Sequence, residues 1–342
     1  MPADYAHRCC GFVRREECAM NEIVFRHSVD EFHARFEVKE QIGVGAYAIV
    51  YRGIDRMSNE QVAIKEVDKT RYSSTDAALE REIFILSEVH HKNIIRLLCT
   101  YVTPLKVFIV TELASGGELL ERVVENGNFS EADARSVIYQ VLKGMKYLHS
   151  KNIVHRDLKL ENILLSDGSS SALVKIADFG LARFFADDSQ LRTICGSPLY
   201  VAPEILDIGA DMDTYTPAVD MWSIGVMLYI LLSGNSPFNN EDEQSLFQMI
   251  RLGEYSMDDH LWDHISDEAK DCVQQLLTVN TSVRMTITEA LEHPWVLGLT
   301  KAKDMELPDS ISTMKRTRLT GHLESFRMMQ DEMRLALQNS NP

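Results

Sequence analysis

The chain has 342 residues, of which 45% are hydrophobic and 25% are charged, and its formal net charge is −16. This balance is typical of an ordinary globular protein. The acidic charge argues against a nucleic-acid binder, which needs a basic face to displace counterions, and it is compatible with basic peptide partners. The six cysteines form no metal-type CxxC pair, and we therefore expect a reducing, intracellular compartment.

No segment predicts a secretory leader, an N-terminal myristoyl group or a membrane span. The first ten residues lack an apolar core, and Pro2 stands where N-myristoylation requires glycine. The longest apolar stretch, Met221 to Leu232, is too short to cross a bilayer and indicates a buried helix. We expect a cytoplasmic protein without a membrane span, and a nuclear location stays open.

The pattern divides the chain into four stretches. Residues 1–35 show no clear period and are expected to be an N-terminal extension. Residues 36–113 consist of short β-rich runs, interrupted by one helix expected from Thr75 to about Val89. Helical patterns dominate residues 114–297, and residues 298–342 form a charged C-terminal tail. Strands followed by helices indicate an α+β fold with a small β-rich N-lobe and a larger helical C-lobe.

The apolar period also sets the element boundaries. A stripe of apolar residues from Val137 to Leu148 predicts a long helix, with Ser130 as its N-cap and Asp133 in its first turn. Further helices are expected over residues 219–232, 242–252, 266–278 and 286–292. The expected strands are Phe36–Ile42, Ile49–Ile54, Gln61–Val67, Leu97–Val102 and Val107–Leu113.

A glycine-containing segment begins at Ile42, between two expected strands. Gly43 and Gly45 allow backbone amides to approach phosphate oxygens without a Cβ in the way. A plain hairpin fits this segment equally well, so it is weak evidence alone. Ala48 stands where a third glycine would complete the usual phosphate-loop pattern.

Lys65 lies on the same face of an expected strand as Ala63. An inward-facing lysine needs an anionic partner, because a buried unpaired charge is costly. Glu82 is a candidate, since it projects from the buried side of the expected helix, between Leu79 and Leu86. The alternative is that Lys65 and Glu82 are two solvated surface charges.

The most specific chemistry lies in His155–Asn162 and in Asp178-Phe179-Gly180. Asp157 can orient an acceptor hydroxyl and take its proton, and Lys159 can meet a transferring phosphate. Asn162 and Asp178 bring the oxygen ligands that Mg²⁺ prefers. Farther along, a buried Glu204 would need a cation, and Arg284 is the bidentate candidate.

Taken in this order, the segments resemble the signatures of the protein kinases over about residues 36–297. The chain is similar to the calcium/calmodulin-dependent protein kinase group, including its checkpoint-kinase-like and death-associated-like relatives. Lys159 after Asp-Leu resembles a serine/threonine kinase. The segments that carry the group resemblance are SGGELLERV at 115–123, TICGSPLYVAPEIL at 193–206, VDMWSIGVMLYILLSGNSPF at 219–238 and ALEHPW at 290–295.

The resemblance implies an ATP- and Mg²⁺-dependent transferase that phosphorylates serine or threonine in protein substrates. A pseudokinase scaffold is the rival reading, but it has no chemical need for the intact set Lys65, Glu82, Asp157, Asn162 and Asp178. A small-molecule phosphotransferase of related fold is disfavoured by the peptide-binding segment 193–206.

The resemblance also implies an ATP site. Val50, Ala63 and Leu164 would sandwich the adenine, and Thr111 would be the gatekeeper. Glu112, Leu113 and Ala114 would form the hinge. Glu118 would either hold the ribose or meet an arginine three residues before the acceptor.

A peptide site is implied as well. The resemblance assigns three further roles: Glu161 adds weaker basic selectivity, Ser197 bonds Asp157 and Lys159 beneath the peptide, and an apolar pocket for the following residue is lined by Ile194, Pro198 and Val201.

Regulation is predicted at two places. Arg156 directly precedes Asp157, and this implies an activation loop ordered by a phosphate, for which Thr193 is the site and an upstream kinase a partner. In the tail, basic Lys315 and Arg316 precede an apolar stripe that includes Phe326 and Met329. Such a helix can be a calmodulin target or an autoinhibitory plug, or it can pack on its own domain. These alternatives stay open.

Overall fold

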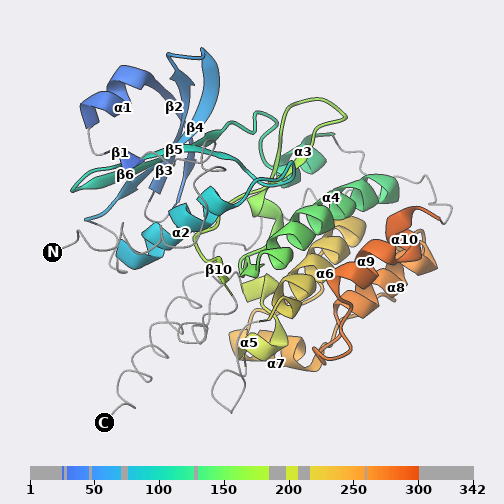
Figure 1. The fold of residues 1–342 in the computed structure, drawn as a ribbon. Coiled ribbons are helices and arrows are strands. Elements are labelled where there is room, and N and C mark those ends of the chain that lie inside the picture. The colour runs from blue at the N-terminus through green and yellow to red at the C-terminus, as the bar shows by residue number, and fades with distance from the viewer. Residues whose placement is uncertain are drawn as a thin grey trace, which may run out of the picture. The chain divides into compact units, whose positions relative to one another are not determined.

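The computed structural model describes residues 25–26, 29–45, 48–70, 76–126, 130–184, 198–206, 216–258 and 260–299. The chain forms two compact units. Unit 1 contains Met1–Thr75 and Leu97–Glu112, and unit 2 contains Asp76–Arg96 and Leu113–Pro342. Strands dominate unit 1 and helices dominate unit 2 (Figure 1), which confirms the predicted α+β, two-lobed class.

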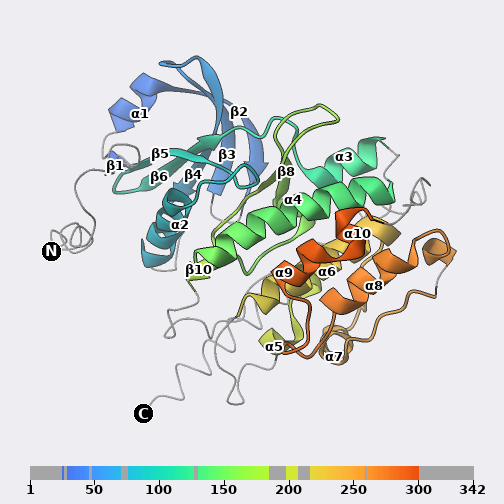
Figure 2. The ribbon, with the colours of Figure 1, turned by 45° about the vertical axis from the view of Figure 1, so that its right-hand side comes forward.

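Unit 1 is built on a six-stranded sheet in the order β1-β5-β6-β4-β3-β2. All five predicted strands are present, with their ends shifted by up to two residues. The extra strand β1 pairs in parallel with β5 at one edge (Figure 2), whereas the other ladders are antiparallel. The bounds are β1 (Phe25–Arg26), β2 (Phe36–Val44), β3 (Ala48–Asp55), β4 (Glu60–Asp68), β5 (Leu97–Val102) and β6 (Lys106–Glu112).

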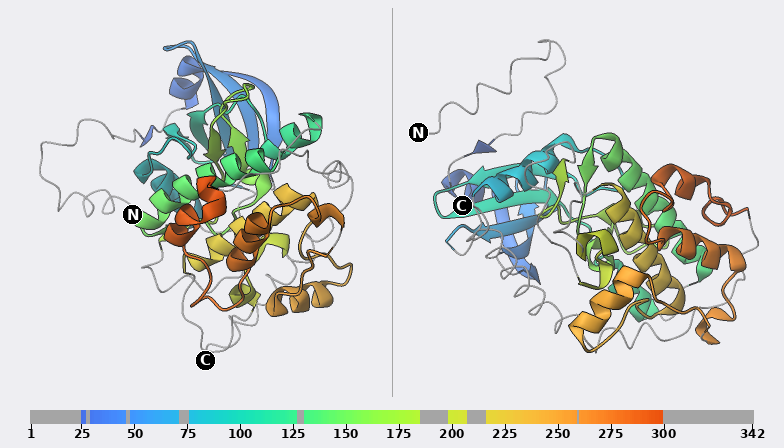
Figure 3. Two further views of the ribbon diagram at one scale, coloured as in Figure 1. Left: turned by 90° about the vertical axis from the view of Figure 1, so that its right-hand side faces the viewer. Right: turned by 90° about the horizontal axis from the view of Figure 1, so that it is seen from below.

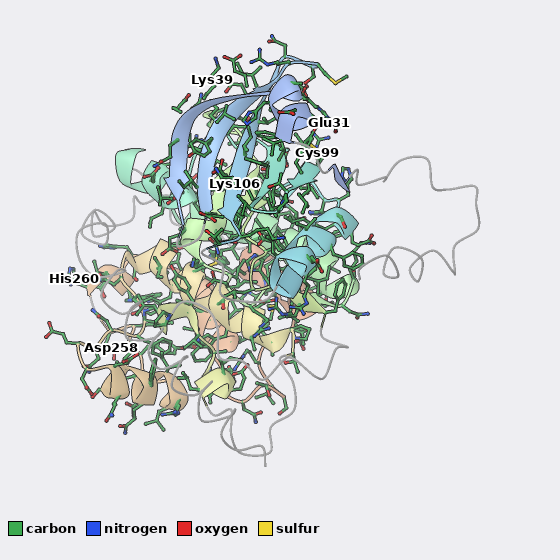
Figure 4. The ribbon with its side chains drawn as sticks, turned by 90° about the vertical axis from the view of Figure 1, so that its left-hand side faces the viewer. Glu31, Lys39, Cys99, Lys106, Asp258 and His260 are labelled. Atoms are coloured by element: carbon green, nitrogen blue, oxygen red, sulfur yellow. The ribbon has the colours of Figure 1, made fainter. Side chains whose placement is uncertain are left out.

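The sheet has two faces of different character. Val62 and Ile64 of β4 are both 1% exposed and belong to an apolar cluster, whereas Ala63 and Lys65 point to the other face. Surface positions such as Lys39 of β2 and Lys106 of β6 carry charge (Figure 4). Alternation thus separates the core of unit 1 from the face that carries Lys65.

A short helix, α1 (Val29–Arg35), contributes to that core. Phe32 is 0% exposed, and its ring stacks on Phe108 at 4.2 Å and meets Tyr101 edge-on at 5.4 Å. Arg35 fixes the end of α1, because its guanidinium binds Asp55 at 2.7 Å and lies 4.9 Å from the centre of the Phe36 ring. Residues assigned from sequence to an extension therefore pack as part of unit 1.

Unit 2 is mainly helical, and its longest helix, α4, runs beside α6 (green and yellow in Figure 3). Its elements are α2 (Asp76–Glu88), α3 (Leu119–Asn126), α4 (Glu131–Ser150), β7 (Ile153–Val154), η1 (Leu160–Asn162), β8 (Ile163–Leu165), β9 (Val174–Ile176), β10 (Arg183–Phe184), η2 (Pro198–Tyr200), α5 (Pro203–Leu206), α6 (Ala218–Ser233), α7 (Glu243–Leu252), η3 (His260–Trp262), α8 (Asp267–Leu276), α9 (Ile287–Glu292) and α10 (Pro294–Leu297).

The predicted helices and one cap are confirmed. The Ser130 side chain accepts a hydrogen bond from the Asp133 amide, and the Asp133 carboxylate accepts one from the Ser130 amide, so α4 begins with a capping box. Helix α6 is buried along its length, in agreement with its largely apolar sequence. Within the described ranges, no helix has both the length and the apolar character to cross a membrane.

Two buried charged side chains hold unit 2 together. Glu131 is 1% exposed, and it accepts hydrogen bonds from Ser266 Oγ at 2.7 Å and from Trp295 Nε1 at 2.8 Å, which joins α4 to α8 and α10. Arg284 donates to both carboxylate oxygens of Glu204, at 2.7 and 2.8 Å, as the sequence predicted.

Replacing Phe32 with alanine should lower the free energy of unfolding by about 3 to 5 kcal/mol, because the substitution leaves a cavity among packed aromatic rings. Urea denaturation checks this. The matched control is Leu105→Ala, since Leu105 lies in the same unit and is 63% exposed, and its cost should stay below about 1 kcal/mol. Equal costs for the two variants would contradict a structural role for α1.

Candidate active site

Asp157 lies in a loop between β7 and η1, and the buried carboxylate of Asp220 holds this loop in place. Asp220 Oδ2 accepts from the His155 amide and Oδ1 from the Arg156 amide, each at 3.0 Å. His149 Nε2 lies 2.9 Å from Oδ2. Burial works to raise the pKa of Asp220, but the contact with His149 and these amide bonds outweigh it and lower that pKa.

The backbone of this loop is strained where it approaches Asp157. Arg156 has a φ of 70°, in the left-handed region that non-glycine residues rarely adopt. Such a conformation persists only where surrounding contacts enforce it. The hydrogen bonds that the His155 and Arg156 amides donate to Asp220 supply that enforcement.

The Asp157 side chain is oriented by two neighbours. Lys159 Nζ lies 2.9 Å from Asp157 Oδ2. Asn162 Nδ2 donates to the Asp157 carbonyl oxygen at 2.8 Å and to Oδ2 at 3.2 Å. Burial works against the charged form of Lys159, but Asp157 outweighs it, so the pKa of Lys159 is raised. This geometry presents a carboxylate and an ammonium group side by side.

Asp178 is brought next to Asn162 by the backbone. The amide of Ala177 donates to the Asn162 carbonyl oxygen at 2.9 Å, and Asp178 follows directly, with a φ of 60°. His155 links the two loops: its Nε2 lies 3.2 Å from the Ala177 oxygen, and its ring meets Phe179 at 5.1 Å. The predicted pair Asn162 and Asp178 therefore lies within one small region.

This donor set fits a magnesium ion. The side-chain nitrogen of Asn162 donates to Asp157, so the side-chain oxygen is the atom that could bind the metal. Asp178 adds a carboxylate. The described residues contain no group of three or more His, Cys, Asp or Glu that could hold a metal alone. Mg²⁺ suits such a site, because it takes few protein ligands and completes its shell with water and substrate phosphates.

Glu82 lies in the same unit. It is 5% exposed on α2, and its Oε2 is 3.6 Å from where a Cβ on Gly180 would be. Asp178 Oδ1 is 3.3 Å from that position. The structure therefore places Glu82 beside the Asp178 loop. Lys65, its predicted partner, belongs to unit 1, so the Lys65–Glu82 pair stays a prediction.

Glu118 and Leu164 are also brought together. Residues 115–118 run antiparallel to β8, with Glu118 opposite Leu164. The Gly116 amide donates to Leu165 at 3.0 Å. A Cβ at Gly116 would lie 2.2 Å from the Asp167 carbonyl oxygen, so only glycine permits this approach. The chain after Ala114 is thereby fixed against the strand that carries Leu164.

In unit 1, the remaining predicted nucleotide residues are aligned across the sheet. Gly43 is paired with Val50, Val50 with Lys65, and Ala63 with Thr111. Residues opposite each other in an antiparallel ladder point to the same side. Ile42 is 43% exposed, and Gly45 donates its amide to the Ala48 oxygen at 2.7 Å. Glu112 ends β6.

The predicted peptide-binding residues are only partly within the described chain. Pro198 and Val201 are buried, and Glu161 accepts a long hydrogen bond of 3.4 Å from the Tyr200 hydroxyl. Burial raises the pKa of Glu161, and Asp157 adds to this effect while Lys159 opposes it. Thr193, Ile194 and Ser197 lie outside the described residues.

Sequence reasoning missed His149 and the role of Asp220. His149 and Asp220 are more than 60 residues apart in the chain, so no local spacing links them. A signal was nevertheless present: an acidic residue inside the apolar run from Val219 to Leu232 must have buried polar partners.

Asp220→Asn should lower the free energy of unfolding by about 2 to 4 kcal/mol, because its amide nitrogen would face backbone N–H groups and leave one unsatisfied. Chemical denaturation measures this. Asp271→Asn is the matched control: Asp271 also pairs with a histidine, His293, but its side chain is 55% exposed, so the cost should be below about 1 kcal/mol. A smaller effect at Asp220 than at Asp271 would contradict the role of Asp220 in holding the loop that carries Asp157.

Comparison with known proteins agrees with this geometry. The family model described as "Protein kinase domain" matches residues 36–296. Myosin light chain kinase A of Dictyostelium discoideum is 42% identical over 262 residues, covering 76% of this chain and 88% of that protein. Human serine/threonine-protein kinase H1 is 40% identical over 295 residues, covering 85% of this chain and 68% of that protein.

These matches confirm the resemblance to serine/threonine kinases of the calcium/calmodulin-dependent type and the predicted kinase fold. The chain belongs to the protein kinase family and is a protein serine/threonine kinase.

Proposed function

We propose that this kinase transfers the γ-phosphate of ATP to serine or threonine hydroxyls of proteins that carry arginine three residues before the acceptor. Asp157 orients the acceptor hydroxyl and receives its proton, and Lys159 offsets the charge of the transferring phosphate. When bound, Mg·ATP supplies the phosphoryl group and the positive charge of the metal. Asn162 and Asp178 would hold the metal.

One observation supports this most: the Asp157 carboxylate is contacted by Lys159 and Asn162, and the Asn162 carbonyl oxygen accepts a hydrogen bond from Ala177, the residue before Asp178. A base held in place needs little reorganisation when it accepts a proton. A pseudokinase scaffold, the rival function, gives no reason for the loop at Arg156 to carry backbone strain.

The nucleotide is proposed to bind residues of both units. Lys65 contacts its phosphates and pairs with Glu82. The residues that contact the rest of the nucleotide are Ile42, Gly43, Gly45, Val50, Ala63, Thr111, Glu112, Ala114, Leu164 and, through the ribose or a peptide arginine, Glu118. The shared sheet face of Val50, Lys65, Ala63 and Thr111 supports this assignment.

Protein substrates are proposed to contact Glu118 and Glu161 through basic side chains, with Pro198 and Val201 beneath the following residue. Ile194 and Ser197 complete this site. An intracellular, cytoplasmic location is proposed from the cysteine pattern, which has no metal-type pair; among the described residues, Cys99 and Cys272 are buried and form no disulfide. Calmodulin and an upstream kinase stay proposed partners.

A degenerate serine/threonine peptide array with labelled ATP tests the function. The wild type should favour arginine three residues before the acceptor, and Glu118→Gln should flatten that preference while activity persists. Asp157→Asn should lower kcat by about 10²- to 10⁴-fold, because it removes a general base. Asp167→Asn, at an exposed position on the β8–β9 loop, is the matched control and should keep full activity.

The outcomes separate the alternatives. Activity that survives Asp157→Asn would show that another group is the base. Nucleotide binding without transfer by the wild type would establish the scaffold function. Transfer without any basic preference would remove the assigned role of Glu118 and keep the kinase.

Thr193 is proposed as the activating phosphorylation site, because Arg156 stands next to the base and can pair with a phosphate. Phosphatase treatment should lower the activity of the wild type by at least about tenfold, in line with the order-to-disorder change of an activation loop. Thr193→Ala should behave like the dephosphorylated enzyme. Full activity of Thr193→Ala in an unmodified preparation would contradict the proposal.

A further inference from the structure

Helix α4 carries an alternating row of tyrosines and lysines on one side. Tyr139, Lys143, Tyr147 and Lys151, its C-cap, follow one another at intervals of four residues, so they lie on one helix face. Tyr139 is 38% exposed, Lys151 is exposed, and the other two are half-buried. We call these four residues, together with His91 and Lys92, the α4 basic face; α4 is the long green helix of Figure 1.

Two lysines of this face lie over aromatic rings. Lys143 Nζ lies 5.2 Å from the centre of the Tyr139 ring, and Lys151 Nζ lies 5.6 Å from that of Tyr147. Both distances are within the range of cation–π attraction. A solvated lysine usually samples many rotamers, and binding it costs side-chain entropy. The contacts with the two tyrosine rings restrict Lys143 and Lys151 before binding, so less side-chain entropy is lost when a ligand binds.

The segment after α2 anchors the centre of the face. The His91 ring stacks on Tyr147 at 5.2 Å with an interplanar angle of 21°. The His90 amide donates to the Tyr147 hydroxyl at 2.8 Å, and the Asn93 amide donates to His91 Nδ1 at 3.1 Å. Because Nδ1 accepts, the neutral ring carries its proton on Nε2, which is thus a donor.

The local charge is positive although the chain as a whole is acidic. No aspartate or glutamate occurs between Asp133 and Asp157, while the chain has a net charge of −16. Burial lowers the pKa of His91, and the charges of Lys92, Lys175 and Lys143 lower it further. Among the described residues, Lys92, Lys143 and Lys151 form no ion pair with a carboxylate. Within this part of the chain, no carboxylate neutralises their charge.

We propose that the α4 basic face binds an acidic segment of the protein substrates, at a place separate from the transfer site. Four side chains from Tyr139 to Lys151 extend over about 18 Å of helix, at 1.5 Å per residue. This length matches about five or six residues of extended peptide. Carboxylates at alternating positions would reach the ammonium groups, and the peptide's methylene groups would cover the tyrosine rings.

A peptide fits this face better than a polyanion. Nucleic acids and anionic membranes carry extended charge, which the net charge of −16 repels at a distance. A short acidic segment feels mainly the charges within about 8 to 10 Å, because salt screens the rest. The small basic face then dominates over the acidic remainder of the surface.

Direct binding is the first test, and it needs no catalytic activity. An acetylated six-glutamate peptide is titrated into the full chain, with a six-glutamine peptide as the neutral probe. The glutamate peptide alone should bind, more weakly at 300 mM than at 50 mM KCl. Lys143→Gln/Lys151→Gln should weaken binding at least about tenfold, since it removes the two ordered charges.

The matched control is Lys106→Gln/Lys270→Gln, which removes the same charge from lysines that pair elsewhere, with Glu66 and Asp267. It should bind like the wild type, and the thermal midpoints of both double variants should be close to that of the wild type. Equal weakening by both variants would reduce the effect to net charge and overturn the proposal. No binding by the wild type, or equal binding of both peptides, would also overturn it.

The second test asks whether the face recruits substrate, and it uses the kinase activity but not the proposed arginine preference. An acceptor peptide that the enzyme phosphorylates is joined by about twenty glycine and serine residues, a span near 25 Å, to six glutamates or six glutamines. The glutamate version should have a KM about tenfold lower with equal kcat, and Lys143→Gln/Lys151→Gln should abolish that difference. Equal KM values in the wild type would refute substrate recruitment. Absence of any transfer would instead refute the proposed function, and the binding test would still decide the acidic-peptide site.

Discussion

The candidate active site depends on one buried carboxylate, that of Asp220. It lies in the apolar helix α6. Its two oxygens accept hydrogen bonds from the amides of His155 and Arg156 and contact His149. A buried charge is tolerable only with such partners, and the partners in turn fix a loop that would otherwise relax from its left-handed conformation. The buried Asp220 holds the backbone of this loop. The distances among Asp157, Lys159 and Asn162 are kept for that reason.

Local pattern was sufficient for most of the fold. The alternation in β4 and the apolar stripe of α4 predicted both elements and their buried sides, and the Ser130 cap and the Glu204–Arg284 pair were also anticipated. Helix α1 was missed for a physical reason: one buried side chain, Phe32, in seven residues gives no period to detect. Its burial depends on Tyr101 and Phe108, which are far along the chain.

The site divides in the same way. Residue types and order pointed to Asp157, Asn162 and Asp178, since the chemistry of metal and base restricts the choice to few side chains. Their arrangement could not be predicted, because it rests on long-range contacts: Ala177 with Asn162, His155 with Phe179, and segment 115–118 with β8. The positive φ angles of Arg156 and Asp178 have no signature at all, as neither residue is a glycine.

The charged side chains of unit 2 have three distinct roles. Asp220 and Glu131 are buried carboxylates that accept hydrogen bonds, and they stabilise the fold. Glu161 is partly buried, and its burial raises its pKa, so this carboxylate would gain from an arriving cation. Lys143 and Lys151 of the α4 basic face contact aromatic rings rather than carboxylates, so they gain most from an arriving anion. A partner with a basic acceptor region and a separate acidic segment would satisfy both surfaces, and opposite charges on one partner would prevent a general attraction of either kind of polyion.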